Sequence, residues 1–193
     1  IFTSDHGYHL GEHGHWQKRT LFENATRVPL IISGPGINKN EKIMEAPIEL
    51  VDIYPTLMDI TQIEIPEFVS GKSFAPLLRD SSAQVRKSAL TELSVKLGLN
   101  TRVQGYSLKT DRYRLTQWGE KGVLGYELYD HESDKLELNN LSMKKQYQKL
   151  KDSLIGIINY RITEARKKPK GLGPQFEEVS EWYEPETIHS HPK

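Results

Sequence analysis

The first eighteen residues, IFTSDHGYHLGEHGHWQK, constrain the fold of this chain more than any other stretch. A short run of β-forming residues opens the stretch, and glycines then break it into a loop, which is the pattern of a strand end. Asp5 and His6 stand side by side at that point. At the carboxyl end of a parallel strand, such side chains lie in the crevice where ligands bind. A carboxylate and a neutral imidazole can both hold a metal ion, and Lys18, further along, can hold an anion.

Two plainer interpretations of this stretch stay open on the residues alone. In the first, Asp5 caps a turn and His6 packs beside it. In the second, the histidines His6, His9, His13 and His15 form a simple zinc-binding loop. The second interpretation has a weakness, because a glycine-broken stretch supplies no helix on which histidines four residues apart would align.

Composition excludes several classes of protein and of site. The 193 residues carry no formal net charge and 36% are hydrophobic, so they suffice for one ordinary domain or for part of a larger one. Neutral charge gives no general attraction to an anionic membrane or to nucleic acid, and we expect no nucleic-acid partner. No apolar run approaches the roughly 20 residues of a membrane span. The absence of cysteine rules out disulfides, thiolate metal sites and a cysteine nucleophile in these residues.

The hydrophobic pattern of the first part predicts short helices and strands. Residues 20–26 are expected to form a short helix, and residues 28–32, VPLII, a buried strand that ends at Ser-Gly-Pro-Gly. Asp52 is expected to cap a helix over residues 53–60. Residues 74–78 are expected to anchor this part in a hydrophobic core.

A polar stretch at residues 80–87 indicates a subdomain boundary, and a run of strands follows it. Residues 89–95 form one predicted strand. Residues 105–109 and 112–118 form two more, joined by a tight turn, and residues 126–129 complete the meander.

The clearest helix is predicted over residues 141–166, where apolar residues recur every three or four positions. Its other face carries lysines and arginines. This basic face can bind a polyanion, but charged helix faces are usually solvated, and we favour that interpretation. Residues 169–193 show little periodicity and are expected to form an extended tail.

The opening stretch continues into FENATRVPLI, and together they resemble the second signature of the sulfatases. The likeness is strongest to the iduronate-2-sulfatase-like branch. It goes on through PIELVDIYPTL at 47–57, YSLKTDRYRLTQW at 106–118 and ELYD at 127–130. The first motif is long and specific, whereas the later ones are weaker alone but follow the order of the family.

This resemblance implies an α/β fold of the alkaline-phosphatase-like (sulfatase) superfamily. Residues 1–79 would end the large mixed or parallel sheet domain and carry the loop that binds metal and sulfate. Residues 80–168 would form a small C-terminal α+β subdomain, an antiparallel sheet with a packed helix, and residues 169–193 the tail. The other strands of the large sheet would belong to a preceding N-terminal half of the same enzyme.

The resemblance also implies roles for residues of the opening stretch. Asp5 and His6 would bind a divalent cation, which in sulfatases is calcium, although imidazole is a more usual ligand of transition metals such as zinc or manganese. Lys18 would contact the sulfate, because a fixed ammonium near the bridging oxygen stabilises the transition state more than the ground state. His13 would contact the sulfate or the leaving group, or would instead brace the loop through Glu12.

Other residues are assigned to the substrate on weaker grounds. His9 is expected to line the site or lie on the surface, and Tyr8 and His9 would shape the sugar subsite. Arg102 lies at a position from which sulfatases of this branch often contact their substrate. The formylglycine nucleophile of sulfatases would come from the N-terminal half, because no cysteine is present and Ser33 lacks the arginine that the C/S-x-P/A-x-R motif demands.

The reaction that the resemblance implies is hydrolysis of a sulfate ester on a sulfated sugar or polysaccharide, such as a glycosaminoglycan. The implied compartment is periplasmic, extracellular or lysosomal. Two alternatives stay open: a phosphonate or phosphate ester hydrolase of the same superfamily, and a non-catalytic module that binds glycan or metal. An upstream C/S-x-P-x-R motif with paired aspartates would favour the sulfatase.

Overall fold

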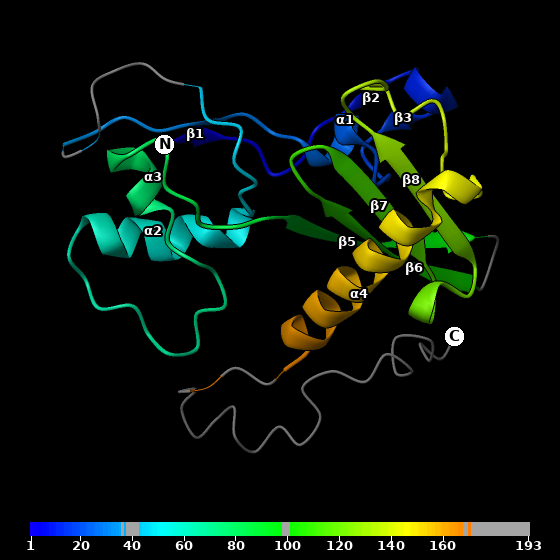
Figure 1. Ribbon diagram of the computed structural model, residues 1–193. Helices are drawn as coiled ribbons and strands as arrows, with labels where there is room; N and C mark the ends of the chain where they lie inside the picture. Colours follow the sequence, from blue (N-terminus) through cyan, green and yellow to red (C-terminus); the bar gives the residue numbers. More distant parts are fainter. Residues whose placement is uncertain (36, 38–42, 98–100, 168–169, 171–193) are drawn as a thin grey trace, which may run out of the picture.

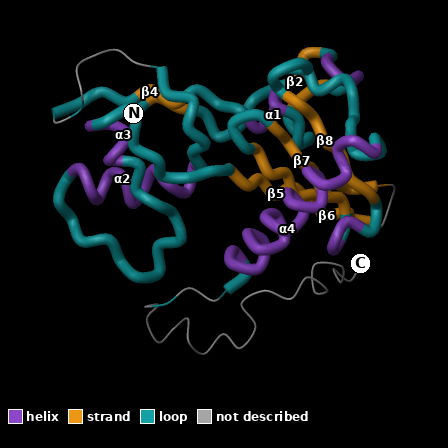
Figure 2. Tube along the Cα trace, viewed as in Figure 1, coloured by secondary structure: helices purple, strands orange, loops and turns teal. Residues whose placement is uncertain are grey.

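The computed structural model describes residues 1–35, 37, 43–97, 101–167 and 170. Two groups of elements lie next to each other (Figure 1). One group holds the first strand and the short helices of the middle of the chain. The other is an antiparallel sheet with a long helix across it, and loops make up much of the first group (Figure 2).

Two pairs of very short strands organise the opening stretch. β1 (Phe2–Thr3) pairs antiparallel with β4 (Leu30–Ile31), and β2 (His9–Leu10) pairs antiparallel with β3 (Trp16–Gln17). Glycine makes the second pair possible, because the 3-10 turn η1 (Glu12–Gly14) between its strands ends on a glycine at positive φ.

The first strand pair is shorter and less buried than the strand predicted over residues 28–32. β1 and β4 are antiparallel, and the strand predicted over residues 28–32 shortens to two residues. Phe2 and Ile31 remain 63% and 61% exposed. The reason is that this sheet has two strands within the described residues, so the outward side chains of both find no apolar cover.

The first hydrophobic core lies among the short helices. η2 (Leu50–Asp52) runs directly into α2 (Ile53–Ile60), as predicted for residues 53–60, and α3 (Ala75–Arg79) packs beside it. The predicted anchor at 74–78 is confirmed. Its buried side chains include Phe74, Leu77 and Leu78.

Asp52 does not cap α2 as predicted. Its backbone is helical, and its buried carboxylate accepts hydrogen bonds from the side chain of Arg86 and from the backbone N–H groups of Glu49 (3.0 Å) and Lys72 (2.8 Å). Glu49 extends this network by pairing with Arg86 and Arg161. The carboxylate therefore connects separate stretches of the chain instead of capping the start of α2.

The second core belongs to a four-stranded antiparallel meander in the order β5-β6-β7-β8. The predicted strands and the tight turn between the second and third are confirmed, and the Thr110 N–H closes that turn on the Tyr113 carbonyl at 2.8 Å. The bounds are β5 (Ala89–Leu97), β6 (Thr101–Lys109), β7 (Tyr113–Trp118) and β8 (Gly125–Asp130).

Helices approach this sheet from both faces. Consecutive residues of a strand point to opposite faces. Leu115 of β7 joins the core under α4 (Gln148–Ala165), whereas Arg114 reaches Glu23 at the start of the short helix α1 (Glu23–Thr26). Gly105 permits the close approach on the second face, because a Cβ there would lie 2.7 Å from the Leu21 side chain.

The long helix begins later than predicted. A 3-10 turn, η4 (Lys145–Tyr147), precedes α4, and the Leu141 N–H donates to the Leu128 carbonyl at 2.8 Å. Residue 141 thus extends the hydrogen bonding of β8 and cannot start the helix. The predicted apolar face is confirmed at Leu154, Ile158 and Ile162.

The basic face predicted for this helix is divided: Lys144, Lys145 and Lys149 are exposed, as the solvated interpretation predicts, whereas two arginines contact other parts of the chain. Arg161 pairs with Glu49, and Arg166 pairs with Glu120. These contacts support a structural role for the two arginines over a polyanion site. The predicted tail, residues 169–193, lies outside the described residues apart from residue 170. Among the helices that the structure describes, none has the length and apolar character needed to cross a membrane.

Candidate active site

A tight turn carries Asp5 and His6 from the end of β1 toward α1. The Ser4 hydroxyl donates to the carbonyl of His6 (2.8 Å), which closes the turn locally. The Gly7 N–H donates to the carbonyl of Ala25 (2.8 Å), which fixes the turn to α1. The position of Asp5 and His6 therefore depends on the position of α1.

Gly7→Ala is expected to destabilise the protein by about 1–3 kcal/mol and to push this turn away from α1. The added Cβ would lie 1.9 Å from the carbonyl oxygen of Asn24, which belongs to the backbone and cannot swing aside. Thermal unfolding measures the loss. Gly156→Ala on α4 is the matched control, because nothing lies within 4 Å of that position and alanine favours a helix by about 1 kcal/mol. An unchanged melting temperature for Gly7→Ala would contradict the close contact.

The side chains of Asp5, His6 and Lys18 converge on one point. Oδ2 of Asp5 lies 3.4 Å from Nε2 of His6, and Nζ of Lys18 lies 2.6 Å from the same nitrogen. The other ring nitrogen, Nδ1, lies 2.7 Å from the carbonyl oxygen of Gly7. Because a carbonyl can only accept, Nδ1 carries the proton, and the lone pair of Nε2 accepts from the ammonium of Lys18.

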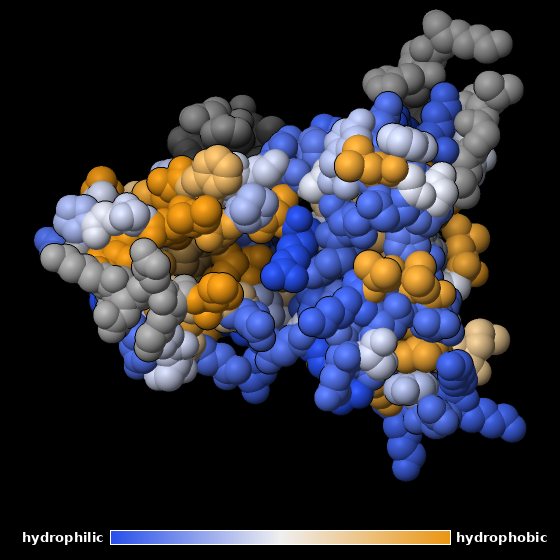
Figure 3. Space-filling view, turned by 90° about the horizontal axis from the view of Figure 1, so that it is seen from above, coloured by the Kyte–Doolittle hydropathy of each residue, from blue (hydrophilic) through white to orange (hydrophobic). Residues whose placement is uncertain are grey.

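These three side chains line a broad groove between the two groups of elements. Figure 3 shows the hollow from above, with apolar side chains gathered on one side and hydrophilic ones on the other. The lining includes the apolar residues 28–32 and the cations Arg19, Arg27 and Arg112. Acidic residues line the groove as well, and Arg27 and Arg112 are paired with carboxylates, so Lys18 is the cation of this lining that lies beside Asp5 and His6.

Asp5 and His6 fit a metal ion as two of its ligands. An exposed carboxylate oxygen and an unprotonated imidazole nitrogen 3.4 Å apart have the separation of two donors on one cation. The Gly7 carbonyl behind Nδ1 supplies the outer hydrogen bond that ligating histidines usually make. Lys18 would have to withdraw from Nε2, because one lone pair cannot serve a metal and an ammonium together. Calcium takes roughly six to eight oxygen ligands, so most of them would come from elsewhere.

His13 packs on an aromatic ring. Its imidazole stacks on Phe22 with 3.8 Å between the ring centroids and 3° between the planes. Bracing through Glu12 is not what the structure shows, because Oε2 of Glu12 accepts from the backbone N–H of Leu10 (2.6 Å). His13 thus braces the loop through Phe22, and its contact with sulfate stays a prediction.

The structure corrects the surface alternative for His9. Its side chain is fully buried, with Nε2 2.6 Å from the Thr20 hydroxyl. Its role in a sugar subsite stays a prediction. Alternation along β2 explains this burial, because His9 points inward and Leu10 outward. Burial and the neighbouring His13 lower the pKa of His9, so the ring stays neutral near pH 7.

Tyr8 and Arg102 are exposed, as substrate-binding residues must be. Neither lines the groove that holds Lys18. Arg102 lies on β6 opposite Lys96 of β5. The structure therefore does not bring these residues together with Asp5 and His6, and their roles toward a substrate stay predictions.

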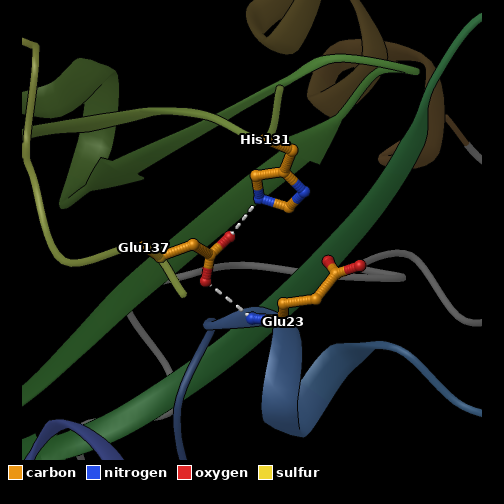
Figure 4. Close-up of side chains that lie close together, drawn as sticks. All are labelled: Glu23, His131 and Glu137. Atoms are coloured by element: carbon orange, nitrogen blue, oxygen red, sulfur yellow. Dashed lines mark hydrogen bonds and ion pairs between the residues drawn. The ribbon is translucent and has the colours of Figure 1, made fainter. Parts of the chain in front are cut away.

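A second cluster has the residue types of a metal site but already contains a cation. Glu23, His131 and Glu137 lie close together (Figure 4). The guanidinium of Arg114 lies among them, with Nε donating to Glu137 (2.5 Å) and Nη2 donating to Glu23. Arg114 is 2% exposed, so its charge takes the place of a metal ion. We did not predict this cluster; the available sequence signal is Glu23 within the FENATR part of the first motif.

The chain belongs to the sulfatases, because the family described as N-sulphoglucosamine sulphohydrolase, C-terminal, matches residues 11–167. Arylsulfatase K of Gallus gallus is 34% identical over 166 residues, which cover 83% of this chain and 31% of that protein. N-acetylglucosamine-6-O-sulfatase of Bacteroides thetaiotaomicron is 31% identical over 182 residues, which cover 93% of this chain and 32% of that protein. The chain thus spans about a third of the length of these relatives. The matches do not single out the predicted iduronate-2-sulfatase-like branch.

Solved structures share the fold. A 2-O GAG sulfatase matches with a TM-score of 0.75 and 26% identity, covering 91% of this chain and 39% of that one. A protein solved in complex with its substrate D-glucosamine-2-N,6-O-disulfate matches with a TM-score of 0.75 and 27% identity over 88% and 35% of the two chains. Phosphonate monoester hydrolase from Silicibacter pomeroyi matches with a TM-score of 0.71 and 26% identity over 84% and 34%. The predicted alkaline-phosphatase-like fold class is confirmed.

Proposed function

We propose that this chain is the C-terminal part of a metal-assisted enzyme that hydrolyses sulfate esters on a sulfated sugar. The observation that carries the proposal is the convergence of Asp5, His6 and Lys18 in one open groove. Family membership supports it. One relative is named as a sulfatase of N-acetylglucosamine, and a similar structure was solved with a sulfated glucosamine as its substrate. By the same likeness, the compartment is periplasmic, extracellular or lysosomal.

The three converging side chains have distinct roles in this proposal. Lys18 binds the sulfate, and its ammonium offsets the negative charge that builds on the bridging oxygen as the S–O bond breaks. Asp5 and His6 hold the divalent cation, which is calcium or, failing that, zinc or manganese. When bound, the cation polarises the sulfate oxygens as a Lewis acid. The Gly7 carbonyl keeps the lone pair of His6 Nε2 aimed at that position.

The attacking group is not among these residues. They contain no cysteine, and Ser33 is followed by the wrong residues for a formylglycine motif. In the proposal, formylglycine and the remaining metal ligands come from the N-terminal half of a protein as long as the relatives. Residues 1–79 end its large domain, and residues 80–168 form its small one.

The proposal predicts that the full-length protein releases inorganic sulfate from a sulfated glucosamine in a metal-dependent reaction. Chelation of divalent cations should lower the rate by at least about tenfold, and calcium should restore it. Ion chromatography of released sulfate gives the measurement. Restoration by zinc or manganese but not by calcium would reassign the ion. A rate that chelation leaves unchanged would contradict the metal role of Asp5 and His6.

A second candidate is hydrolysis of phosphonate or phosphate esters, which the match to the phosphonate monoester hydrolase favours. The same ammonium and cation could stabilise a phosphoryl group. We expect kcat/KM to be higher for an aryl sulfate than for the matching aryl phosphonate. The reverse order would favour the second candidate, and hydrolysis of neither ester would favour a non-catalytic binding module.

A further inference from the structure

We propose that Arg114 and Glu137 are positioning residues that hold α1, through Glu23, in the place where it supports the turn of Asp5 and His6. The catalytic consequence of this role rests on the proposed function. The cluster in Figure 4 then has a use that needs no metal ion: it joins the C-terminal sheet to the candidate active site.

Two residues on the sheet side, Arg114 and Glu137, each form a hydrogen bond with Glu23 at the start of α1. Nη2 of Arg114 donates to the carboxylate of Glu23, and Oε2 of Glu137 accepts from the backbone N–H of Glu23 at 2.7 Å. The second bond satisfies one of the N–H groups that a helix start leaves without an internal partner. Arg114 is itself held by Glu137 and, through Nη1, by the Ser107 hydroxyl of β6 at 2.9 Å. His131 adds a contact of 2.7 Å between its Nε2 and Glu137.

The other side of α1 carries the turn. The Gly7 N–H donates to the Ala25 carbonyl at 2.8 Å, and the Gly7 carbonyl accepts from Nδ1 of His6 at 2.7 Å. The direction of the His6 lone pair therefore follows the position of α1. Phe22, directly before α1, stacks with His13 of η1. The loop between the Asp5–His6 turn and α1 therefore rests on the same support.

The connection is buried, which makes it sensitive to the loss of one charge. The side chains of Arg114 and Glu137 are 2% and 1% exposed. Burial alone would raise the pKa of Glu137, but the hydrogen bond from His131 and the charge of Arg114 hold this pKa below its ordinary value. The carboxylate is therefore ionised at neutral pH, and its contribution to stability is lost as the pH falls through the folded-state pKa. Removing one member leaves a buried charge without its partner.

Glu137→Gln in the full-length protein tests this role. Glutamine keeps the shape of the side chain but removes the charge and one acceptor oxygen. Amide hydrogen exchange of residues 5–18 should become faster, as followed by mass spectrometry. The value of kcat/KM for a sulfate ester should fall about tenfold, and the metal concentration for half-maximal activity should rise, as is typical when the outer support of a metal ligand is lost.

Glu49→Gln is the matched control. Glu49 also bridges two arginines, Arg86 and Arg161, and accepts from a backbone N–H, that of Leu90 (2.7 Å). These contacts lead to α4 and β5, not to α1. The control should lower the melting temperature but leave the exchange of residues 5–18 unchanged. Glu49 also lines the groove, so hydrogen exchange and not kcat/KM decides this comparison. If Glu137→Gln does not fold, Glu23→Gln replaces it, because it weakens the Arg114 pair and keeps the backbone bond.

Equal effects of Glu137→Gln and Glu49→Gln on the exchange of residues 5–18 would overturn the positioning role. Hydrogen exchange needs no substrate, so the two proposals can fail separately. Faster exchange of residues 5–18 in Glu137→Gln, together with an unsubstituted full-length protein that hydrolyses no ester, would support the positioning role and overturn the sulfatase. Unchanged exchange in a Glu137→Gln enzyme with full sulfatase activity would overturn the positioning role and support the sulfatase.

Discussion

Lys18→Ala in the full-length protein is expected to lower kcat/KM for a sulfate ester by on the order of a hundredfold or more, the scale of losing one preorganised charge at the reacting group. Nζ lies 2.6 Å from Nε2 of His6 in the open groove, so an ammonium that withdraws from this nitrogen when a cation binds stays beside the metal position, where a sulfate would lie. The side chain is exposed, so alanine removes the charge with little loss of packing. Steady-state kinetics and thermal unfolding should show a slow enzyme of unchanged stability.

Metal affinity separates this role from a structural one. Lys18 competes with a cation for the lone pair of His6, so the variant should need the same metal concentration or less. Lys149→Ala is the control, since Lys149 is an exposed lysine of α4 that does not line the groove, and it should keep the full kcat/KM. Normal turnover by Lys18→Ala would show that this lysine is a surface group, and a raised metal requirement would assign it to support of the metal site.

The C-terminal sheet could be predicted because its signals are local. Each strand pairs with its neighbour in sequence, and the turn between β6 and β7 is marked by Thr110 and Asp111. The strand at residues 28–32 could not be predicted as well. Its apolar residues indicate a strand, but nothing in them states which strands lie beside it or how much cover it receives, and strand formation depends strongly on those neighbours.

The wrong predictions for single residues have a related cause. Asp52 stands before a helix, where an aspartate usually caps, but Arg86, 34 residues further on, takes its carboxylate. His9 resembles the other histidines of its loop in sequence. Its burial follows from the inward side of a two-residue strand, which the spacing of the glycines does not reveal.

The candidate site also has a part that the sequence predicts and a part that depends on distant residues. The family motif marks Asp5, His6 and Lys18, and the turn at Gly7 follows from ordinary backbone rules. The support beneath them cannot be read from the chain, because Arg114 meets Glu23 from 91 residues away and Glu137 meets it from 114. No spacing rule connects such residues, and each is an ordinary charged side chain until the fold buries it.

Residues 1–193 by themselves are expected to show no sulfatase activity, because the site they carry is incomplete. Asp5 and His6 give two donors where calcium takes roughly six to eight. The residues hold no cysteine, and no serine in a formylglycine motif, to supply the nucleophile. Their apolar surface also lacks cover: Phe2, Ile31 and Val51 are 63%, 61% and 57% exposed, which is a hazard for aggregation.

Hydrolysis of a simple aryl sulfate by purified residues 1–193, compared with the full-length protein, is the measurement. Circular dichroism of the same sample should first show that the C-terminal sheet and α4 have formed, so that inactivity does not merely report unfolding. Activity should appear when the N-terminal half is supplied as a separate chain, and Lys18→Ala in residues 1–193 should prevent it. Clear turnover by residues 1–193 alone would overturn the proposed mechanism, because the reaction would then use a nucleophile contained within these residues.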